Sequence, residues 1–306
     1  MRSRCGVLLW IVFSIVPAVA ASPCQDVPFD FIQNQIVLHA TIDGKGPYNF
    51  LLDTGTRRAM IDTRVVKQLR IPLNGVRNEI SGAGSRRVFG KQVTLGELRI
   101  GTLVVHGLAA DAFDLSALSL KFGRPLDGAL GFGFLESRIV QFDYFRRHIR
   151  FCSESPFGPG NRPPDTRWRA SFPMEFSENS ILPVLGECYI NRKRLPVTLD
   201  TGSGFGLILF PQAIHVLGME QFMPNGRPIV ASGYRGKVLM REGCVRSLRL
   251  KTIDLGAVEA AYVERGYGES ENPEHRAGNL GNIILQDFLI TLDYRHRVVV
   301  LEIAPD

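Results

Sequence analysis

Apolar and polar residues alternate in short runs along most of the chain, and turn-forming residues separate these runs. Alternation with a period of two is typical of strands with one buried face. In the first predicted hairpin, a strand at residues 36–42 is followed by a turn at 43–47 and a return strand at 48–52, which leads to Asp53. A second has the same order at residues 182–190, 191–194, 195–199 and Asp200. Each hairpin therefore delivers one aspartate at the end of a buried strand.

The segments after the two aspartates also correspond, at an offset of about 147 to 150 residues. A short helix is predicted after each aspartate loop, at Thr63 to Leu69 and at Pro211 to Leu217. Glycine-rich stretches at residues 81–85 and 231–236 then precede long predicted strands. This repetition indicates a duplicated unit.

Each half closes with matching segments at identical spacing. Gly128-Ala129-Leu130-Gly131 leads to Phe142-Asp143-Tyr144, and Gly278-Asn279-Leu280-Gly281 leads to Leu292-Asp293-Tyr294. Short strands bounded by glycine favour an all-β fold over α/β. We expect two similar β-barrel-like lobes of six or seven strands, related by a pseudo-twofold, with an active-site cleft between them.

Composition between the halves supports this division. The segment 153–168 is rich in proline and glycine and is predicted to be a linker. The expected units are therefore an N-terminal lobe at 21–152 and a C-terminal lobe at 169–306. The chain is long enough to bury two cores.

The first twenty residues have the features of a secretory signal peptide. Arg2 and Arg4 precede an apolar run that ends at Ala18-Val19-Ala20, and the run is too short to span a bilayer. We expect residues 1–20 to be removed, with the protein exported to the periplasm or secreted and without a membrane span thereafter. An uncleaved N-terminal anchor is the alternative.

Net charge argues against a nucleic-acid partner. The formal charge is +6, and removal of Arg2 and Arg4 leaves about +4. The arginines are scattered and form no basic stripe with interleaved aromatic residues. Arg57 and Arg58 directly follow the first aspartate loop, where they would either select acidic substrate side chains or lie in solvent.

Four cysteines remain after residue 20, and an even number permits two disulfides in an oxidising compartment. We favour Cys24 with Cys152 and Cys188 with Cys244, because each pair closes within one half, although sequence alone allows three pairings. Buried free thiols are the alternative. No cysteine or histidine spacing resembles a zinc site, so no metal or cofactor is expected.

The tripeptide Asp-Thr-Gly occurs twice, at Asp53-Thr54-Gly55 and Asp200-Thr201-Gly202. One copy is most simply an ordinary turn after a strand. Two copies at equivalent points of a duplicated unit predict a catalytic pair instead. Two adjacent carboxyl groups cannot both ionise cheaply, so they would share one proton, and the pair can then act as general base and general acid.

The other residues of the motif have physical roles that can be anticipated. Gly55 and Gly202 would let the chain turn sharply beneath the carboxylates. The buried hydroxyls of Thr54 and Thr201 need partners, most simply backbone groups across the pseudo-twofold. The hydroxyl residues that follow the glycines, Thr56 and Ser203, are expected to donate to the outer carboxylate oxygens.

These motifs together resemble the aspartic proteases of the pepsin and retropepsin clan, and especially the retropepsin-like bacterial aspartyl proteases with two lobes in one chain. The resemblance implies catalysis by Asp53 and Asp200, a cross-brace between the threonines, and a flap over the cleft. Four flap candidates lie in the glycine-rich stretches, namely Gly82, Gly84, Gly233 and Tyr234. Tyr234 would either cover a substrate or be an exposed loop tyrosine. Asn279 stands where the family has an apolar residue, at the start of the segment Asn279-Leu280-Gly281. We expect this difference to affect the packing of the second lobe and not its carboxylate.

We therefore predict an exported aspartic-type endopeptidase that acts on peptides or proteins, for which a monomer is sufficient. A catalytically silent bilobal peptide-binding protein of the cell envelope is the alternative, and a structural envelope protein is a weaker one. The recurring Asp143 and Asp293 are expected to form local contacts at strand ends. No Ser, His and Asp grouping and no nucleotide-binding loop has the required sequence context.

Overall fold

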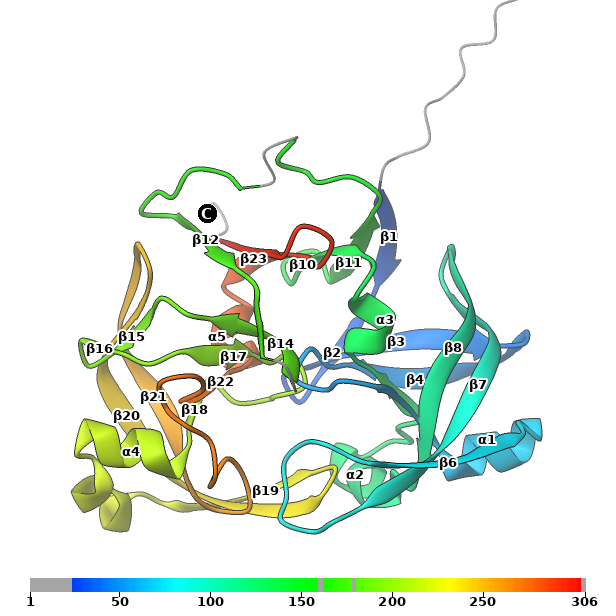
Figure 1. Ribbon diagram of the computed structural model, residues 1–306, viewed down its shortest axis with the longest axis horizontal. Coiled ribbons are helices and arrows are strands. Elements are labelled where there is room, and N and C mark those ends of the chain that lie inside the picture. Colours follow the sequence, from blue (N-terminus) through cyan, green and yellow to red (C-terminus); the bar gives the residue numbers. More distant parts are fainter. Residues whose placement is uncertain (1–23, 159–161, 178–179, 304–306) are drawn as a thin grey trace, which may run out of the picture.

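The computed structural model describes residues 24–158, 162–177 and 180–303, so the predicted signal peptide lies outside the described residues. Strands dominate the chain and form three sheets, which confirms the predicted all-β class. Figure 1 shows two curled sheets side by side and a smaller sheet that lies across both of them. Among the described helices, none has the length and apolar character needed to cross a membrane.

The first lobe is an eight-stranded sheet with the strand order β2-β3-β4-β9-β5-β8-β7-β6. Its strands are β2 (Asp30–Ile32), β3 (Gln35–Ile42), β4 (Lys45–Leu52), β5 (Ala59–Asp62), β6 (Leu73–Glu79), β7 (Phe89–Ile100), β8 (Leu103–Phe113) and β9 (Gly128–Leu130). Strands β3 and β4 form the predicted antiparallel hairpin, and β4 continues parallel to β9. This parallel pair ends at Asp53.

The second lobe is a ten-stranded sheet in which β17 and β22 form the equivalent parallel pair, directly before Asp200. Its strands are β13 (Glu175–Ser177), β14 (Ser180–Leu185), β15 (Cys188–Ile190), β16 (Lys193–Arg194), β17 (Val197–Leu199), β18 (Leu207–Leu209), β19 (Pro228–Gly233), β20 (Gly236–Leu250), β21 (Ile253–Arg265) and β22 (Gly278–Leu280). The segment predicted as one strand at 182–190 is divided here, since β14 pairs with β17 whereas β15 pairs with β16 and β20.

The third sheet, which we call the base sheet, joins the two lobes. Its order is β1-β11-β10-β23-β24-β12. The strands are β1 (Cys24–Pro28), β10 (Ile139–Asp143), β11 (His148–Cys152), β12 (Arg169–Pro173), β23 (Phe288–Asp293) and β24 (Val298–Ile303). Strands β10 and β23, one from each half, pair antiparallel at its centre, where Gln141 Nε2 donates to Thr291 Oγ1 at 3.2 Å.

The expectation of six or seven strands per lobe is therefore wrong. The lobes contain eight and ten strands, and the final segments of both halves leave their lobes to form a shared sheet. The reason is that β10, β23 and β24 are buried almost throughout and need cover on both faces. Alternation of hydrophobicity predicts the strands but not the sheet to which each belongs.

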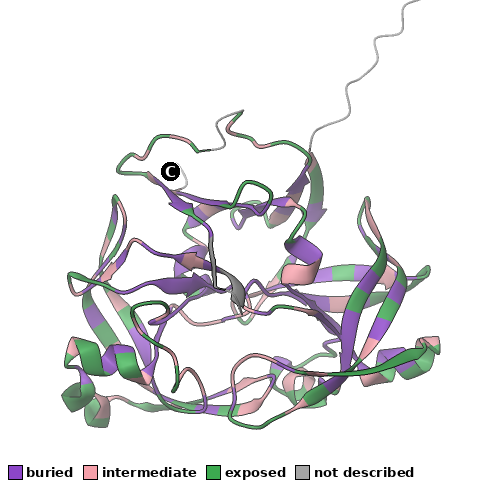
Figure 2. Cartoon of the chain, viewed as in Figure 1, coloured by how far each residue is buried: buried purple, intermediate pink, exposed green. Residues whose placement is uncertain are grey.

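Burial follows the alternation along the strands. In Figure 2, buried and exposed residues alternate on the long outer strands, while the inner strands are buried nearly throughout. β3 shows this pattern, since Ile36, Leu38, Ala40 and Ile42 are all buried against the core. One continuous apolar core extends through both lobes and the base sheet.

The helices are short, and they cover the ends of the strands. Both predicted helices are present, α1 (Thr63–Leu69) and α4 (Pro211–Leu217). The Asp62 carboxylate caps α1 by accepting from the Arg64 N–H at 2.7 Å, and Pro211 begins α4. The others are α2 (Ser116–Phe122), α3 (Phe132–Leu135), α5 (Asn282–Leu285) and the 3-10 helix η1 (Glu220–Asn225).

One of the two expected disulfides is formed. Cys24 and Cys152 are bonded, as predicted, and connect β1 to β11 at the edge of the base sheet. The predicted pairing of Cys188 with Cys244 is wrong, because Cys188 lies opposite Leu250 in the sheet. Cys244 is six residues farther along the same strand, roughly 20 Å away, whereas a disulfide needs Cα atoms within about 7 Å.

Candidate active site

Asp53 and Asp200 each follow the last residue of a buried strand, β4 and β17. Each is held by the closing segment of its own lobe, because the Asp53 N–H donates to the Leu130 carbonyl at 3.0 Å and the Asp200 N–H donates to the Leu280 carbonyl at 2.9 Å. Both aspartates are buried. The duplicated backbone thus places two carboxyl groups at equivalent points of the two lobes.

The two glycines allow the carboxyl groups to meet. A Cβ atom on Gly55 would lie 2.5 Å from Asp200 Oδ1, and a Cβ atom on Gly202 would lie 2.3 Å from Asp53 Cγ. Any side chain at these positions would displace the opposite aspartate. Each glycine N–H also donates to Oδ1 of its own aspartate, at 2.8 Å for Gly55 and 3.0 Å for Gly202. Close approach of the two loops therefore requires glycine at both positions.

Thr54 and Thr201 join the two loops reciprocally. The Thr54 hydroxyl donates to the Leu199 carbonyl at 2.7 Å and accepts from the Thr201 N–H at 3.0 Å. The Thr201 hydroxyl donates to the Leu52 carbonyl at 2.7 Å and accepts from the Thr54 N–H at 3.1 Å. Both side chains are fully buried, so each hydroxyl satisfies two backbone groups that water cannot reach. These four bonds form the cross-brace that the resemblance implies.

Thr56 and Ser203 do not make the contacts expected of them. Within the described chain, no hydrogen bond joins either hydroxyl to a carboxylate of the pair. Both residues lie against the closing segments instead, since the Thr56 carbonyl accepts from Phe132 N–H at 3.0 Å and the Ser203 carbonyl accepts from Asn282 N–H at 3.0 Å. Their support of the loops is through packing and backbone contacts.

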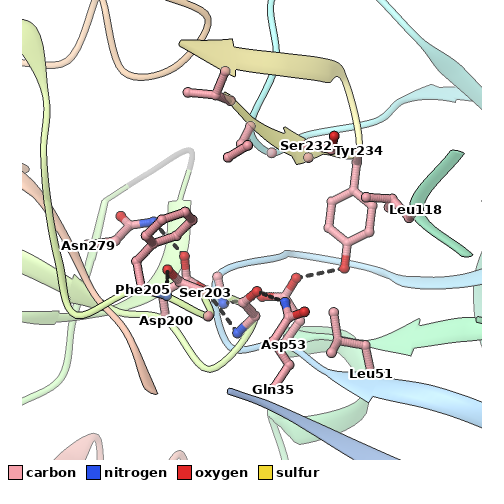
Figure 3. A pocket seen from close by; sticks show the side chains of 18 of the residues that line it. Gln35, Leu51, Asp53, Leu118, Asp200, Ser203, Phe205, Ser232, Tyr234 and Asn279 are labelled. Atoms are coloured by element: carbon pink, nitrogen blue, oxygen red, sulfur yellow. Dashed lines mark hydrogen bonds between the residues drawn. The ribbon is translucent and has the colours of Figure 1, made fainter. Parts of the chain in front are cut away.

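The side-chain donors to the carboxylates come from elsewhere. The Tyr234 hydroxyl donates to Asp53 Oδ2 at 2.7 Å, and Asn279 Nδ2 donates to Asp200 Oδ2. Figure 3 shows Tyr234 reaching from the turn between β19 and β20 to Asp53, with Asn279 beside Asp200 on the opposite side. Tyr234 is buried, so the interpretation as an exposed loop tyrosine is wrong.

The two glycine-rich stretches, residues 81–85 and 231–236, meet above the carboxyl groups and form what we call the roof. The Arg235 N–H donates to the Ala83 carbonyl at 2.8 Å, and the Arg86 N–H donates to the Arg235 carbonyl at 3.1 Å. Gly84 and Gly233 permit this approach, because a Cβ on Gly84 would lie 2.1 Å from Arg235 and one on Gly233 would lie 2.4 Å from Ala83.

Gly82 also belongs to the roof and makes room for Tyr234. A Cβ on Gly82 would lie 2.9 Å from Cδ2 of the Tyr234 ring, and the φ angle of +121° at Gly82 disfavours any other residue. All four flap candidates therefore contribute to one structure that covers the carboxyl pair.

Burial dominates the electrostatics of the pair. Burial and the negative charge of Asp200 raise the pKa of Asp53 to about 7, against the hydrogen bonds from Tyr234 and Gly55. Burial also raises the pKa of Asp200, where the charge of Arg276 and the hydrogen bonds from Gly202 and Asn279 oppose it. Two such groups share a proton over a wide pH range, which is the state that general acid–base chemistry requires.

A cavity of about 260 Å³ lies between the carboxyl pair and the roof. Its walls are mainly apolar on both sides, with Gln33, Gln35 and Lys121 among the polar residues that also line it, and the residues that form them come from both lobes. They include Leu51, Leu118 and Leu126 from the first lobe and Ile208, Val238 and Met240 from the second. The cavity thus has an acidic floor and apolar walls, which suits a substrate with apolar side chains and a polar reacting group.

The remaining candidates lie outside this cavity. Arg58 Nε donates to Asp111 Oδ2 at 2.7 Å, so it is already paired. Asp143 and Asp293 accept from the backbone N–H groups of Arg146 and His296, which are local contacts as expected. No group of three or more potential metal-ligating side chains occurs among the residues of the described chain.

Three positions of the second lobe carry polar residues that sequence reasoning did not assign to the site. At an offset of 150 residues, Leu126, Ala129 and Phe132 of the first half correspond to Arg276, Asn279 and Asn282 of the second. Asn279 contacts Asp200, whereas its difference from the family pattern was expected to affect only packing. These three positions could have been identified from the sequence by comparing the two halves residue by residue.

Comparison with known proteins supports this picture for the first lobe. Residues 38–134 match the family model described as aspartyl protease, which belongs to the pepsin and retropepsin clan. The match includes Asp53 and both glycines of the first roof stretch, and it spans less than half of the chain. No curated protein matches the chain.

Proposed function

We propose that the protein is an exported aspartic endopeptidase that hydrolyses peptide bonds with Asp53 and Asp200. The observation that carries this proposal is the meeting of two buried carboxyl groups, each on its own braced loop, on the floor of a cavity. Burying two acids costs free energy, and a protein without acid–base chemistry has no need of both. The aspartyl protease match of the first lobe supports the same reaction class.

The chemistry needs no covalent intermediate with the protein. The ionised carboxylate removes a proton from a water molecule as the water oxygen attacks the peptide carbonyl carbon, and the neutral carboxyl protonates the carbonyl oxygen. The resulting tetrahedral intermediate collapses when its C–N bond breaks: the carboxyl that took the proton of the water donates it to the leaving nitrogen, and the other carboxylate takes a proton from a hydroxyl of the intermediate as the new carboxylic acid forms. Both carboxyl groups then return to their starting protonation states.

The cavity and its roof favour an extended peptide as the substrate. A space of about 260 Å³ accommodates a few side chains and not a folded domain. Backbone of both roof stretches borders the cavity, so a peptide bound there would lie along it as an added strand does, which is a common mode of peptide recognition. The roof stretches must separate to admit such a chain, because they are hydrogen-bonded to each other.

Export is part of the proposal and has its own support. The disulfide between Cys24 and Cys152 is of the kind that persists in oxidising compartments. Its first cysteine follows the expected cleavage site after Ala20 by only a few residues. Expression of the full chain followed by N-terminal sequencing of the exported protein should give Ala21 as the first residue.

The function is tested with the processed protein and a diverse peptide mixture, incubated from about pH 3 to pH 8, with mass spectrometry to identify new termini. Asp53→Asn and Asp200→Asn should each reduce cleavage by about a thousandfold or more, since each variant lacks one of the two proton-transfer groups. Cleavage that survives either change would place the reaction elsewhere. Peptides that bind without being cleaved at any pH would favour the silent peptide-binding protein.

A further inference from the structure

A buried guanidinium lies behind the carboxyl pair, on the side of Asp200 only. The Arg276 side chain is 15% exposed, and every donor nitrogen has a partner. These partners are Thr198 Oγ1 at 2.9 Å, Glu271 Oε1 at 3.0 Å, Tyr267 Oη at 3.0 Å and Asn279 Oδ1 at 3.0 Å. The first half has Leu126 at the equivalent position, so Asp53 has no such neighbour.

Arg276 fixes the orientation of the Asn279 amide. A guanidinium can only donate, so the amide oxygen must face Arg276. The amide nitrogen then faces the opposite way, and its two hydrogens go to Tyr267 Oη, at 2.9 Å, and to Asp200 Oδ2. With the amide reversed, a nitrogen would face Arg276 and an oxygen would face the carboxylate, which loses both contacts.

This orientation makes Oδ2 of Asp200 an acceptor. A proton on that oxygen would point at an N–H hydrogen of Asn279, so the contact is favourable only when the oxygen is unprotonated. Oδ1 of Asp200 also accepts, from the Gly202 N–H. Asp53 differs because its outer oxygen meets the Tyr234 hydroxyl, which can either donate or accept. Only Asp53 can therefore carry a proton without losing a hydrogen bond.

We propose that Asn279, oriented by Arg276, is a positioning residue that assigns the charge of the pair to Asp200 and the proton to Asp53. This inference rests on the proposed function and deepens it, because Asp200 then becomes the general base that activates water and Asp53 the general acid that protonates the carbonyl. The first-lobe residues Leu126 and Ala129 have no polar group for the same task.

The other ionisable groups around the pair do not titrate with it. Tyr234 and Tyr267 line the cavity with the two carboxyl groups, and the charge of Asp53 acts on the more distant Tyr294. Burial raises the pKa of each of the three hydroxyls, so all three stay neutral below pH 8. The pKa of Arg276 is raised although burial opposes this, since Tyr267, Glu271 and Asp200 stabilise its charge. Glu271 is the remaining acid of the network and pairs with Arg276. The order in which protons are lost near the cavity is therefore set by Asp53 and Asp200 alone.

The experiment reads protonation directly, so it does not depend on a substrate. The processed protein is labelled with ¹³C at the aspartate carboxyl carbons and titrated from about pH 3 to pH 9 by NMR, with Asp53→Asn and Asp200→Asn to assign the two signals. Asp200 should ionise first and Asp53 last. In Asn279→Ala the midpoint of Asp200 should rise by about one to two pH units, because a hydrogen bond to a charged group is lost.

Asn282→Ala is the matched control. Asn282 is an equally buried asparagine on the same side, but it donates to the Thr201 carbonyl at 2.7 Å and not to a carboxylate. Its replacement should lower stability and leave both midpoints within about 0.3 pH units. If Asn279→Ala does not fold, Asn279→Asp keeps the shape but replaces the donor by an oxygen, and it should make Asp200 retain its proton to a higher pH.

Two results would overturn the inference. One is a wild-type protein in which Asp53 ionises before Asp200, and the other is an equal effect of Asn279→Ala and Asn282→Ala on the midpoints. For a peptide that the protein cleaves, the acid limb of the kcat/KM profile should move upward in Asn279→Ala by the same amount as the NMR midpoint. Absence of cleavage would contradict the proposed function alone, since the carboxyl titration would still report the order of ionisation.

Discussion

The two aspartate loops agree in the backbone features that hold the carboxyl groups together and differ in the side chains behind them. Both follow a parallel strand pair, both have glycine beneath the opposite carboxylate, and the threonine bonds are reciprocal to within 0.1 Å. Behind the loops, the first lobe has apolar residues at positions where the second lobe has polar ones. These pairs are Leu126 and Arg276, Ala129 and Asn279, and Phe132 and Asn282.

The difference between the two loops separates the residues that must be the same in both lobes from those that need not be. The glycines and threonines act on the opposite loop, so a change in one lobe would disturb the other. Asn279 and Arg276 act only on their own aspartate, and their counterparts were free to become apolar. Two identical chains would give both carboxyl groups the same surroundings, whereas one chain with two lobes can give them different proton affinities.

The largest expected effect is on the symmetric part. Gly55→Ala and Gly202→Ala should each lower kcat/KM by about a thousandfold, because the new methyl group would occupy the position of the opposite carboxyl group. Gly133→Ala is the control, since its methyl group would meet only the Arg57 carbonyl, at an ordinary 3.7 Å. A large loss in only one of the two glycine variants would break the symmetry described for the loops.

The second-largest expected effect is on the pH dependence of the free energy of unfolding. The folded-state pKa of Asp53 is raised to about 7 from an unfolded value near 3.8, so between these values the folded protein binds a proton that the unfolded chain has lost. The free energy of unfolding should therefore fall as pH rises from about 4 to about 7, by about 2–4 kcal/mol.

Urea unfolding from pH 4 to pH 8 checks this slope and compares the two aspartates. Asp53→Asn should remove most of the slope and should be more stable than the wild type at pH 7, because it removes the group with the raised pKa. Asp200→Asn should only reduce the slope, since Asp53 stays buried and loses only the nearby charge. Equal slopes in all three proteins would show that the pair does not titrate as described.

The smallest expected effect is on the cross-brace. Thr54→Val and Thr201→Val each remove a buried hydroxyl and leave a backbone carbonyl and N–H without partners, which should cost about 2 kcal/mol in either variant. The double variant should cost less than the sum, because the two hydroxyls belong to one network. Chemical denaturation of the three variants measures this, and a cost that differs twofold between the single variants would show that the brace is unequal.

Much of the fold and the centre of the site could be predicted from the sequence. Alternating runs predicted the hairpins, the two predicted helices matched α1 and α4 to the residue, and the repeated tripeptide located both aspartates. These features depend on local patterns or on the comparison of two similar segments. The disulfide between Cys24 and Cys152 was also correct, because both cysteines lie at the ends of the first half.

The parts that sequence reasoning missed depend on long-range register. The register of β15 against β20 places Cys188 opposite Leu250, and this keeps the remaining cysteines apart. The base sheet could not be predicted, because the sequence pattern does not show with which strand each final strand pairs. The donors to the carboxylates were missed because Tyr234 and Asn279 are distant in sequence from the aspartates they contact.

The base sheet has a consequence for the order in which the protein can become competent during its synthesis. Strands β23 and β24 leave the ribosome after both aspartates, and β23 supplies the pairing with β10 that joins the halves. A nascent chain that contains Asp53 and Asp200 but not yet β23 therefore lacks the sheet that sets the distance between their lobes. We expect the two acids to remain apart until β23 has been synthesised and has paired with β10.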